Sequence, residues 1–375
     1  IIYRKMLPKE AAMKPHNLSL HTKREYSPKL LRIFFLLAAI ALGFLLYYRA
    51  SQSVICLSET EPSFYLEEND PVFLEEAASN PFPSLSVPTQ LTKISDTYFI
   101  VDCYHDQIVY SDSLEKPLDE WLVLTDEIDK GHTIAGDGSV YLADDTENNR
   151  ILIFEKKKER FVHTQTFSDI GIRPHYVIYN ESDKTFYAWS SMTGEMYLFK
   201  REKDSSRVFL HKILQLPALD GYYVRSFTIM GNDIYFVSGN SSIIRADLHS
   251  FRILEEYPVP DAIAGMVQLT LIDGYYYITV STDKAGSQDA ATIIRTRDLK
   301  DLASSAYEDV YAAFADDGTQ SILPSADGSF AGMGTPYYIT QFEGHYYLTE
   351  HRLPGHSIWS FDSENGVLKN VRALY

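Results

Sequence analysis

The amino-acid sequence predicts an all-β fold and, within that class, a six-bladed β-propeller. An aromatic-rich strand recurs six times after Thr92, each time between an alternating strand and a polar turn. Most neighbouring copies lie about 40 to 50 residues apart, which is the length of a four-stranded blade. The composition agrees, because the 375 residues include 27 Tyr, and Tyr favours strands over helices. The residues that mark the six copies are Phe99, Tyr141, Tyr187, Tyr235, Tyr277 and Tyr347.

The clearest copy runs from Ser139 to Phe154 (SVYLADDTENNRILIF) and consists of two alternating strands around a polar turn. Successive side chains of a strand point to opposite faces, so we expect Tyr141 and Ala143 on the face opposite to that of Val140. With the preceding GHTIAGDG, the stretch resembles the NHL-type repeat. This resemblance implies a six-bladed propeller.

Residues 91–375 are therefore expected to form six blades, and a closed ring leaves no long unpaired strand edge. The sixth blade is displaced by an insertion from Arg297 to Gly334. Within the insertion, Leu302, Tyr307 and Val310 could follow helical spacing, whereas Tyr307–Phe314 could equally be the outer strand of blade five. We expect a helical turn followed by that strand. Ala326–Gly334 contains three Gly and is expected to form a flexible loop.

Charge and cysteine content argue against a nucleic-acid-binding protein and against a fold held by a disulfide framework. The net charge is −17, although residues 1–32 are basic, so the remainder is strongly acidic and repels nucleic acid. Only Cys56 and Cys103 occur, so no disulfide framework supports the fold. A single bridge between these two residues stays open.

The N-terminal part predicts a membrane anchor. Ile33–Tyr48 carries no charge and is flanked by Arg32 and Arg49, whose side chains can reach the membrane interface. Because residues 1–32 are basic, they are expected to be a cytoplasmic segment, followed by a transmembrane helix that acts as a signal anchor. The protein is then single-pass in the cell membrane, with an extracytoplasmic (extracellular) propeller; a cleaved signal peptide is the alternative. Residues 49–90 are acidic, contain Pro and predict an extended spacer, although the apolar residues Phe64, Phe73 and Phe82 leave open that parts of it dock on the propeller.

Polar residues gather where the inner strands of consecutive blades begin, at the face of a propeller where the channel opens. These residues are His132, His175, Arg225 and Gln268, with Tyr337 from blade six. Donors that converge from several strands predict ligand binding, with Arg225 facing an anionic or carbonyl group. Side chains that only hold channel water are the alternative. The ends of the second strands add Asp102, Asp144, Ser190, Ser238, Val280 or Ser281, and Glu350 to this face.

The segment Gly131–Ile151 also resembles part of the peptidyl-hydroxyglycine amidating lyase propellers, in which His residues near the inner-strand starts hold a catalytic zinc. The resemblance implies His132 and His175 as zinc ligands, whereas Arg225 stands where a third ligand is needed. We therefore expect no cofactor and a binding module for a small molecule, glycan or protein at the channel face. A metal-dependent lyase or hydrolase that uses the two His residues, with a divalent metal such as zinc, is the alternative.

The turn that holds Asp144, Asp145, Glu147 and Asn148 lacks the alternating ligand spacing of an EF-hand loop. We expect a solvated turn that hydrogen-bonds its own backbone, and no calcium site.

Overall fold

The computed structural model describes residues 28–51, 54–59, 66–68, 77–158, 160–314, 334–351 and 357–375. The chain divides into two compact units, Ile1–Ala50 and Ser51–Tyr375. In the first unit, the helix α1 (Pro28–Ser51) contains the apolar stretch Ile33–Tyr48. Among the helices in the described ranges, none combines the length and the apolar character that crossing a membrane requires.

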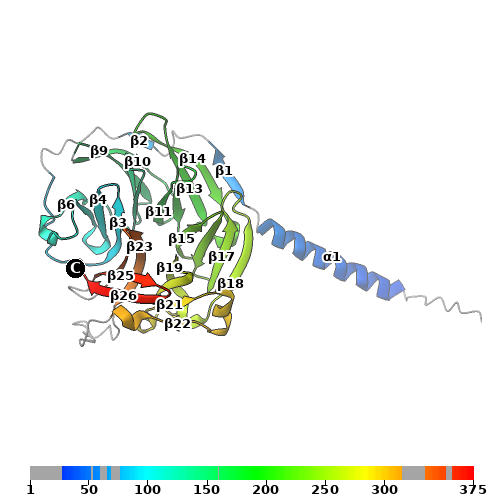
Figure 1. Cartoon of the computed structure of the whole chain (residues 1–375). Helices are drawn as coiled ribbons and strands as arrows, with labels where there is room; N and C mark the ends of the chain where they lie inside the picture. The colour runs from blue at the N-terminus through cyan, green and yellow to red at the C-terminus, as the bar shows by residue number, and fades with distance from the viewer. Residues whose placement is uncertain are drawn as a thin grey trace, which may run out of the picture. The chain divides into compact units, whose positions relative to one another are not determined.

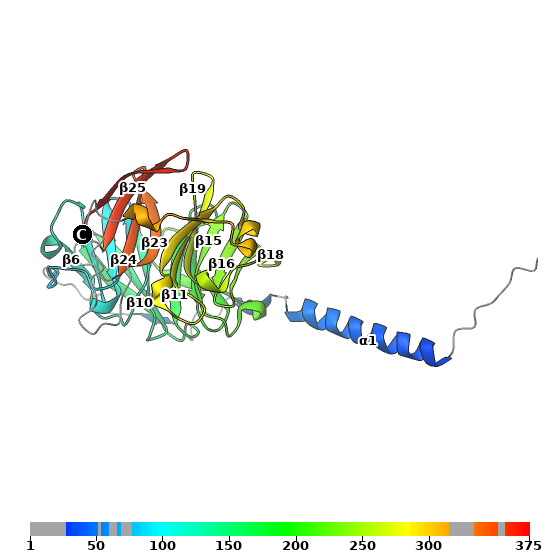
Figure 2. The same ribbon diagram turned by 90° about the horizontal axis from the view of Figure 1, so that it is seen from below.

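The second unit is a ring of six antiparallel sheets, which confirms the all-β, six-bladed propeller (Figure 1). The first strand of each blade contacts the first strands of its neighbours, so these six strands line the centre. Figure 2 shows the same ring after a rotation of 90° about the horizontal axis. Each of the six second strands lies where the sequence predicts it, within one or two residues.

The strands have the following bounds. Blade 1 consists of β3 (Pro88–Ile94), β4 (Thr97–Asp102), β5 (Gln107–Ser111) and β6 (Leu122–Thr125). Blade 2 consists of β7 (Ile134–Gly136), β8 (Val140–Asp145), β9 (Arg150–Lys157) and β10 (Arg160–Phe167). Blade 3 consists of β11 (Pro174–Asn180), β12 (Thr185–Ser190), β13 (Glu195–Arg201) and β14 (Val208–Gln215). Blade 4 consists of β15 (Val224–Met230), β16 (Asp233–Ser238), β17 (Ser242–Asp247) and β18 (Ile253–Pro258). Blade 5 consists of β19 (Gly265–Ile272), β20 (Tyr275–Thr282), β21 (Thr292–Thr296) and β22 (Glu308–Asp309). Blade 6 consists of β23 (Thr335–Phe342), β24 (His345–His351), β25 (Ile358–Glu364) and β26 (Val367–Ala373). Short 3-10 helices connect several strands: η2 (Cys103–His105), η3 (Leu118–Glu120), η4 (Pro217–Leu219), η5 (Asp261–Ile263) and η6 (Gln288–Ala290).

The hydrophobic core consists of apolar clusters that lie between neighbouring blades. Tyr141 and Ala143 pack with Phe99 toward blade 1, in one such cluster. Val140, on the other face of the same strand, packs with Phe186 toward blade 3. The predicted alternation of β8 is therefore confirmed, and it explains why both faces of a blade must be apolar: each face covers a neighbouring blade.

Blades 1 and 6 close the ring without sharing a strand. Side chains make the connection instead. Thr349 Oγ1 donates a hydrogen bond to the backbone oxygen of Thr89 at 2.7 Å, and Tyr375 donates its hydroxyl hydrogen to the backbone oxygen of Leu114 at 2.6 Å. The apolar cluster between these blades includes Trp121, which meets the Tyr375 ring edge to face.

The predicted spacer is not an extended linker along its described residues. β1 (Ile55–Glu59) pairs with β14 at the outer edge of blade 3, and β2 (Leu66–Glu68) pairs with β10 of blade 2 (Figure 1). The expectation of a free spacer is therefore wrong for these two strands. Composition could not predict which strands these segments pair with. The partners are the unpaired backbone N–H and C=O groups on the outer strands of blades 2 and 3, and such groups can pair with any extended segment.

The insertion in blade 5 contains the 3-10 helix η7 (Leu299–Ser304), then the two-residue strand β22, then the 3-10 helix η8 (Tyr311–Phe314). A helical turn followed by a strand is confirmed, although the strand is much shorter than Tyr307–Phe314. The flexible loop expected over Ala326–Gly334 lies outside the described residues except for Gly334.

Candidate functional site

His132 and His175 lie against each other at the end of the channel where the inner strands begin. Their ring centroids are 3.6 Å apart and the ring planes make an angle of 28°, so the two imidazoles are stacked. Both residues are almost fully buried, with 5% and 2% of their surface exposed. His132 lies two residues before the inner strand β7 of blade 2, and His175 is the second residue of β11, so similar positions in two neighbouring blades produce the stack.

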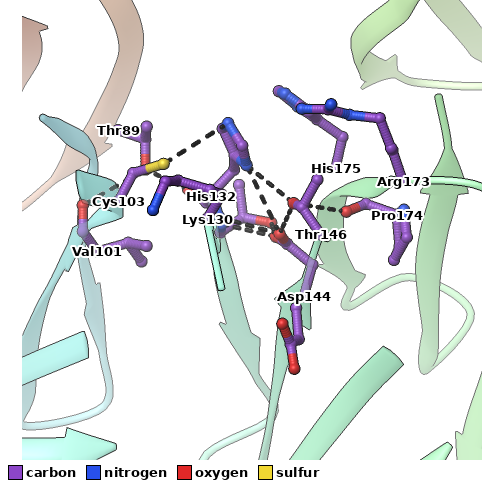
Figure 3. Close-up of polar contacts among 12 residues, drawn as sticks. Thr89, Val101, Cys103, Lys130, His132, Asp144, Thr146, Arg173, Pro174 and His175 are labelled. Atoms are coloured by element: carbon purple, nitrogen blue, oxygen red, sulfur yellow. Dashed lines mark hydrogen bonds and ion pairs between the residues drawn. The ribbon is translucent and has the colours of Figure 1, made fainter. Parts of the chain in front are cut away.

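The contacts of His132 define its protonation. Its Nδ1 lies 2.9 Å from Thr146 Oγ1, which also contacts the backbone oxygen of Pro174 at 2.8 Å (Figure 3). Thr146 Oγ1 also lies 2.9 Å from Asp144 Oδ2, and both this carboxylate and the Pro174 oxygen are acceptors, so Thr146 gives its one hydrogen to one of them and accepts from Nδ1–H of His132. The Nε2 of His132 then carries a lone pair, and it lies 3.9 Å from Cys103 Sγ on the opposite side of the ring.

The same reasoning applies to His175. Its Nδ1 lies 3.1 Å from the backbone oxygen of Arg225 and 3.4 Å from the hydroxyl of Tyr338. Nδ1 therefore carries the hydrogen, and Nε2 carries a lone pair. Within the described residues this Nε2 has no hydrogen-bond partner. A ligand atom that donates a hydrogen bond would satisfy it.

Burial and nearby cations keep both imidazoles neutral. Burial, reinforced by the positive charges of Arg173 and Arg225, lowers the pKa of His132 to about 3. Burial and the neighbouring His132 hold the pKa of His175 well below its ordinary value. Burial also raises the pKa of the Cys103 thiol. A thiolate paired with an imidazolium is thus disfavoured, so the contact between Cys103 and His132 does not have the charge state of an activated cysteine nucleophile.

Aromatic and cationic side chains surround the stacked pair. The guanidinium groups of Arg173 and Arg225 lie 5.9 and 5.4 Å from the centroid of the Tyr223 ring, and the ring of His175 meets Tyr223 edge to face at 5.6 Å. Tyr337 is close enough for the charge of Arg225 to oppose the rise that burial causes in its pKa. We call His132, His175, Arg173, Arg225, Tyr223 and Tyr337 the channel mouth.

The two arginines of the channel mouth differ in their partners. Arg173 forms an ion pair with Glu147 at 2.8 Å. Arg225 donates to the hydroxyl of Ser281, a neutral partner. Within the described residues Arg225 has no carboxylate partner, although its side chain is half-buried. Among the described residues, Arg225 is therefore the guanidinium of the channel mouth that has no carboxylate partner.

Further polar atoms near the channel mouth lack partners. The Nε of Arg173 and the hydroxyl of Ser191 are buried without a hydrogen bond in the described part of the chain. Leaving a buried polar group unsatisfied costs about 1–3 kcal/mol. Ser191 is linked to the channel mouth through its backbone, because its N–H donates to the Arg173 oxygen at 2.9 Å. Two neighbouring residues, Arg173 and Ser191, thus each have a buried polar atom without a partner among the described residues, which indicates a ligand or ordered water beside them.

Gln268 does not join the channel mouth. Its Oε1 accepts from the backbone N–H of Ile339 at 2.7 Å and its Nε2 donates to the oxygen of the same residue at 3.2 Å. Gln90 accepts in the same way from the backbone N–H of Ile134, at 2.8 Å. Both glutamines therefore connect the inner strands of neighbouring blades, and Gln268 is a structural residue. The structure brings His132, His175, Arg225 and Tyr337 together and places Gln268 elsewhere.

The arrangement of the two histidines does not fit a shared zinc ion. A metal lies in the plane of each imidazole that binds it, about 2 Å from the nitrogen. Two stacked rings whose planes differ by 28° do not share such a point. In the parts of the chain that the structure describes, there is also no group of three or more His, Cys, Asp or Glu residues that could hold a metal ion.

The polar residues at the ends of the second strands hold the backbone. Asp144 accepts from the N–H groups of His132 and Thr133, at 2.9 and 2.7 Å. Asp102 accepts from Ser86 and Val87 in the same manner, at 3.0 Å each. These carboxylates fix the chain where it enters the inner strand. The expectation of a solvated turn is wrong for Asp144 and Asp145, because both are fully buried and Asp145 accepts from the side chain of Arg150.

Sequence reasoning missed four residues of the site: Cys103, Thr146, Arg173 and Tyr223. Arg173 and Tyr223 each lie two residues before a predicted site residue, His175 and Arg225, so their place next to the inner-strand starts was a usable signal. Cys103 and Thr146 follow second strands, and nothing in their local sequence distinguishes them from ordinary loop residues.

Solved structures with the same fold confirm the propeller architecture. A 6-phosphogluconolactonase-like protein from Bacteroides uniformis is 12% identical, with a TM-score of 0.51 over 78% of this chain and 85% of that chain. A similar protein from Bacteroides fragilis is 11% identical, with a TM-score of 0.51 over 76% and 84%. A streptogramin B lyase is 14% identical, with a TM-score of 0.49 over 83% and 88%. No protein-family model and no curated protein matches the chain, so the NHL repeat is not confirmed. At these identities the likeness concerns the fold alone.

Proposed function

We propose that the channel mouth binds a small molecule that carries an anionic group and at least one hydroxyl or N–H donor, and that the protein is a binding module. The observation that carries the proposal is the guanidinium of Arg225, half-buried and without a carboxylate partner in the described chain. A charge withdrawn from water without a counter-charge is unfavourable. An anion in contact with Arg225 would remove that cost, and the planar guanidinium favours carboxylate or phosphate.

The electrostatic environment supports an anionic ligand. The whole chain has a net charge of −17, yet Arg173 and Arg225 both act on the histidines of the channel mouth. Clefts lined by charges of one sign concentrate oppositely charged ligands. Arg173 is paired with Glu147, so the attraction of an anion to this site rests on Arg225, which stands out in a chain that is acidic overall.

The lone pair of His175 Nε2 specifies the second feature of the ligand. It can only accept a hydrogen bond, because the hydrogen of this ring is on Nδ1, which donates to Arg225. A ligand with only acceptor atoms would leave Nε2 unsatisfied. An anion that also carries a hydroxyl satisfies both groups.

Binding of defined probes to the full chain tests the proposal. The probes are acetate, glycolate, D-gluconate and 6-phosphogluconate, the last because two similar folds are described as 6-phosphogluconolactonase-like. We expect glycolate to bind more tightly than acetate in calorimetry. We expect Arg225→Ala to weaken binding at least tenfold, since a hydrogen bond to a charged group contributes about 1.5–3 kcal/mol. Arg252→Ala, at an exposed arginine in blade 4, is the matched control.

Equal affinity in the wild type and in Arg225→Ala would reject the proposal. Conversion of a bound probe, detected by mass spectrometry, would show an enzyme in place of a binding module. The membrane anchor over residues 33–48 and the extracytoplasmic position of the propeller stay predictions, and the binding proposal does not depend on them.

A further inference from the structure

Large apolar side chains are exposed directly beside the channel mouth. Ile172 is 52% exposed and Tyr222 is 42% exposed. Met192 connects them through its backbone: its N–H donates to the Ile172 oxygen at 3.3 Å, and its oxygen accepts from Gly221 at 3.1 Å. We call Ile172, Met192 and Tyr222 the apolar ridge.

The apolar ridge adjoins the cationic part of the channel mouth. Ile172 immediately precedes Arg173, and Tyr222 immediately precedes Tyr223, the ring that lies beside both guanidinium groups. On the blade 1 side, Tyr104 is 57% exposed and its ring centroid lies 5.4 Å from Lys130 Nζ. Arg173 and Lys130 are paired with Glu147 and Asp106, so the charge beside the ridge that has no carboxylate partner among the described residues is that of Arg225, 5.4 Å from the Tyr223 ring.

The backbone of the ridge is fixed. The N–H of Ile172 donates to Ser190 Oγ at 2.8 Å, and the same hydroxyl donates to the Ile172 oxygen at 3.0 Å. Gly171, with φ at +56°, leaves no room for a Cβ, because such an atom would lie 2.2 Å from Ser190 Oγ. The ridge is thus held in an exposed position by its own turn. Single exposed apolar residues need no explanation, but apolar residues grouped at a binding site indicate a binding surface.

We propose that the ligand of the channel mouth is amphiphilic, with its anionic head at Arg225 and an apolar body lying on the apolar ridge. This inference rests on the proposed function and names the class of ligand within it: a small acid whose hydroxyl-bearing head is attached to an alkyl or aromatic body. Polar groups occupy the buried side of the site, around His175, and apolar groups occupy the exposed side. The body of the ligand therefore extends outward across Ile172 and Tyr222.

A series of 2-hydroxy acids tests the inference: glycolate, 2-hydroxybutanoate, 2-hydroxyhexanoate and 2-hydroxyoctanoate, all below the concentration at which they aggregate. Each buried methylene contributes about 0.8 kcal/mol, so we expect the affinity to rise about fourfold per methylene that reaches the ridge. The variant I172S/Y222S should lose this dependence on chain length and keep the affinity for glycolate. Leu254→Ser, an exposed apolar residue on β18, is the control and should keep the dependence. Far-UV circular dichroism confirms that each variant is folded, and Tyr222→Ser alone replaces the double variant if that variant unfolds.

The results separate this inference from the proposed function. If glycolate binding depends on Arg225 but the affinity does not change with chain length, the amphiphilic ligand is refuted and anion binding stands. If the affinity rises with chain length but this dependence survives in I172S/Y222S, the apolar body does not lie on the apolar ridge, and the inference is refuted in that form while anion binding stands. If no acid binds in a manner that depends on Arg225, both proposals fail.

Discussion

Tyr375 closes the ring, and its replacement measures how much the closure contributes to stability. Its hydroxyl donates to the Leu114 oxygen at 2.6 Å, its backbone oxygen accepts from Ser357 at 2.6 Å, and its ring meets Trp121 at a centroid distance of 5.9 Å. Leu114 and Trp121 belong to blade 1, and Ser357 precedes the third strand of blade 6. One side chain therefore joins two blades that share no strand.

Tyr375→Phe removes only the hydroxyl and should lower the free energy of unfolding by about 1 kcal/mol. Tyr375→Ala also removes a half-buried ring, which costs roughly half of the 3–5 kcal/mol lost for a fully buried aromatic ring. Together the two effects amount to about 3 kcal/mol for Tyr375→Ala, and the melting temperature should fall by about 2 °C per kcal/mol in a domain of this size.

Urea unfolding followed by tryptophan fluorescence provides the measurement. Tyr346→Phe is the matched control, because Tyr346 stacks on Phe361 and its hydroxyl has no hydrogen-bond partner in the described chain. A free energy of unfolding for Tyr375→Ala within about 0.5 kcal/mol of the wild type, comparable to an ordinary surface substitution, would refute this account of ring closure.

Two further predictions concern ionisation and metal binding. Burial raises the pKa of Tyr141, Tyr235 and Tyr375 to about 12, so the neutral phenols favour the folded state; this stabilisation is complete below about pH 10 and is lost as the pH rises through 12. The propeller should therefore unfold cooperatively in that interval when circular dichroism is followed against pH, and a fold that is unchanged at pH 12 would contradict the assignment. Because the stacked rings of His132 and His175 do not share a coordination point, zinc should leave the melting temperature of the wild type and of His175→Ala equally unaffected; a rise that is confined to the wild type would show that one ring turns to form a metal site.

The blades could be predicted from the sequence because their signal is local. In β8, Tyr141 and Val140 lie on opposite faces, and this alternation can be predicted from the sequence alone. The structure keeps it, because each face packs against a neighbouring blade. The pairing of β1 with β14 could not be predicted in this way. The acidic, Pro-containing composition of residues 49–90 suits a solvated linker, and only the folded ring creates the outer edge that the segment satisfies.

The site was predictable in position and not in detail. The shared location of His132 and His175 at inner-strand starts predicts that they are close, but stacking depends on the distance between blades 2 and 3. Gln268 also lies in an inner strand, as the fourth residue of β19, yet its amide is complementary to the backbone of Ile339 in the next blade. The sequence shows that a side chain can donate and accept hydrogen bonds. Whether it bonds to a ligand or to the backbone depends on which residues of the neighbouring blade lie next to it in the folded propeller.

The neutral state of the two histidines connects the fold with the selectivity proposed for the channel mouth. A protonated imidazole would add positive charge and would favour any anion, with or without hydroxyl groups. Burial and the field of Arg173 and Arg225 prevent that protonation, so His175 presents a lone pair and only Arg225 presents an uncompensated charge. The site then distinguishes between anions by their hydrogen-bond donors. An acid with a hydroxyl near its carboxylate satisfies both the guanidinium of Arg225 and Nε2 of His175, whereas an acid without a hydroxyl leaves the lone pair of Nε2 next to an acceptor oxygen.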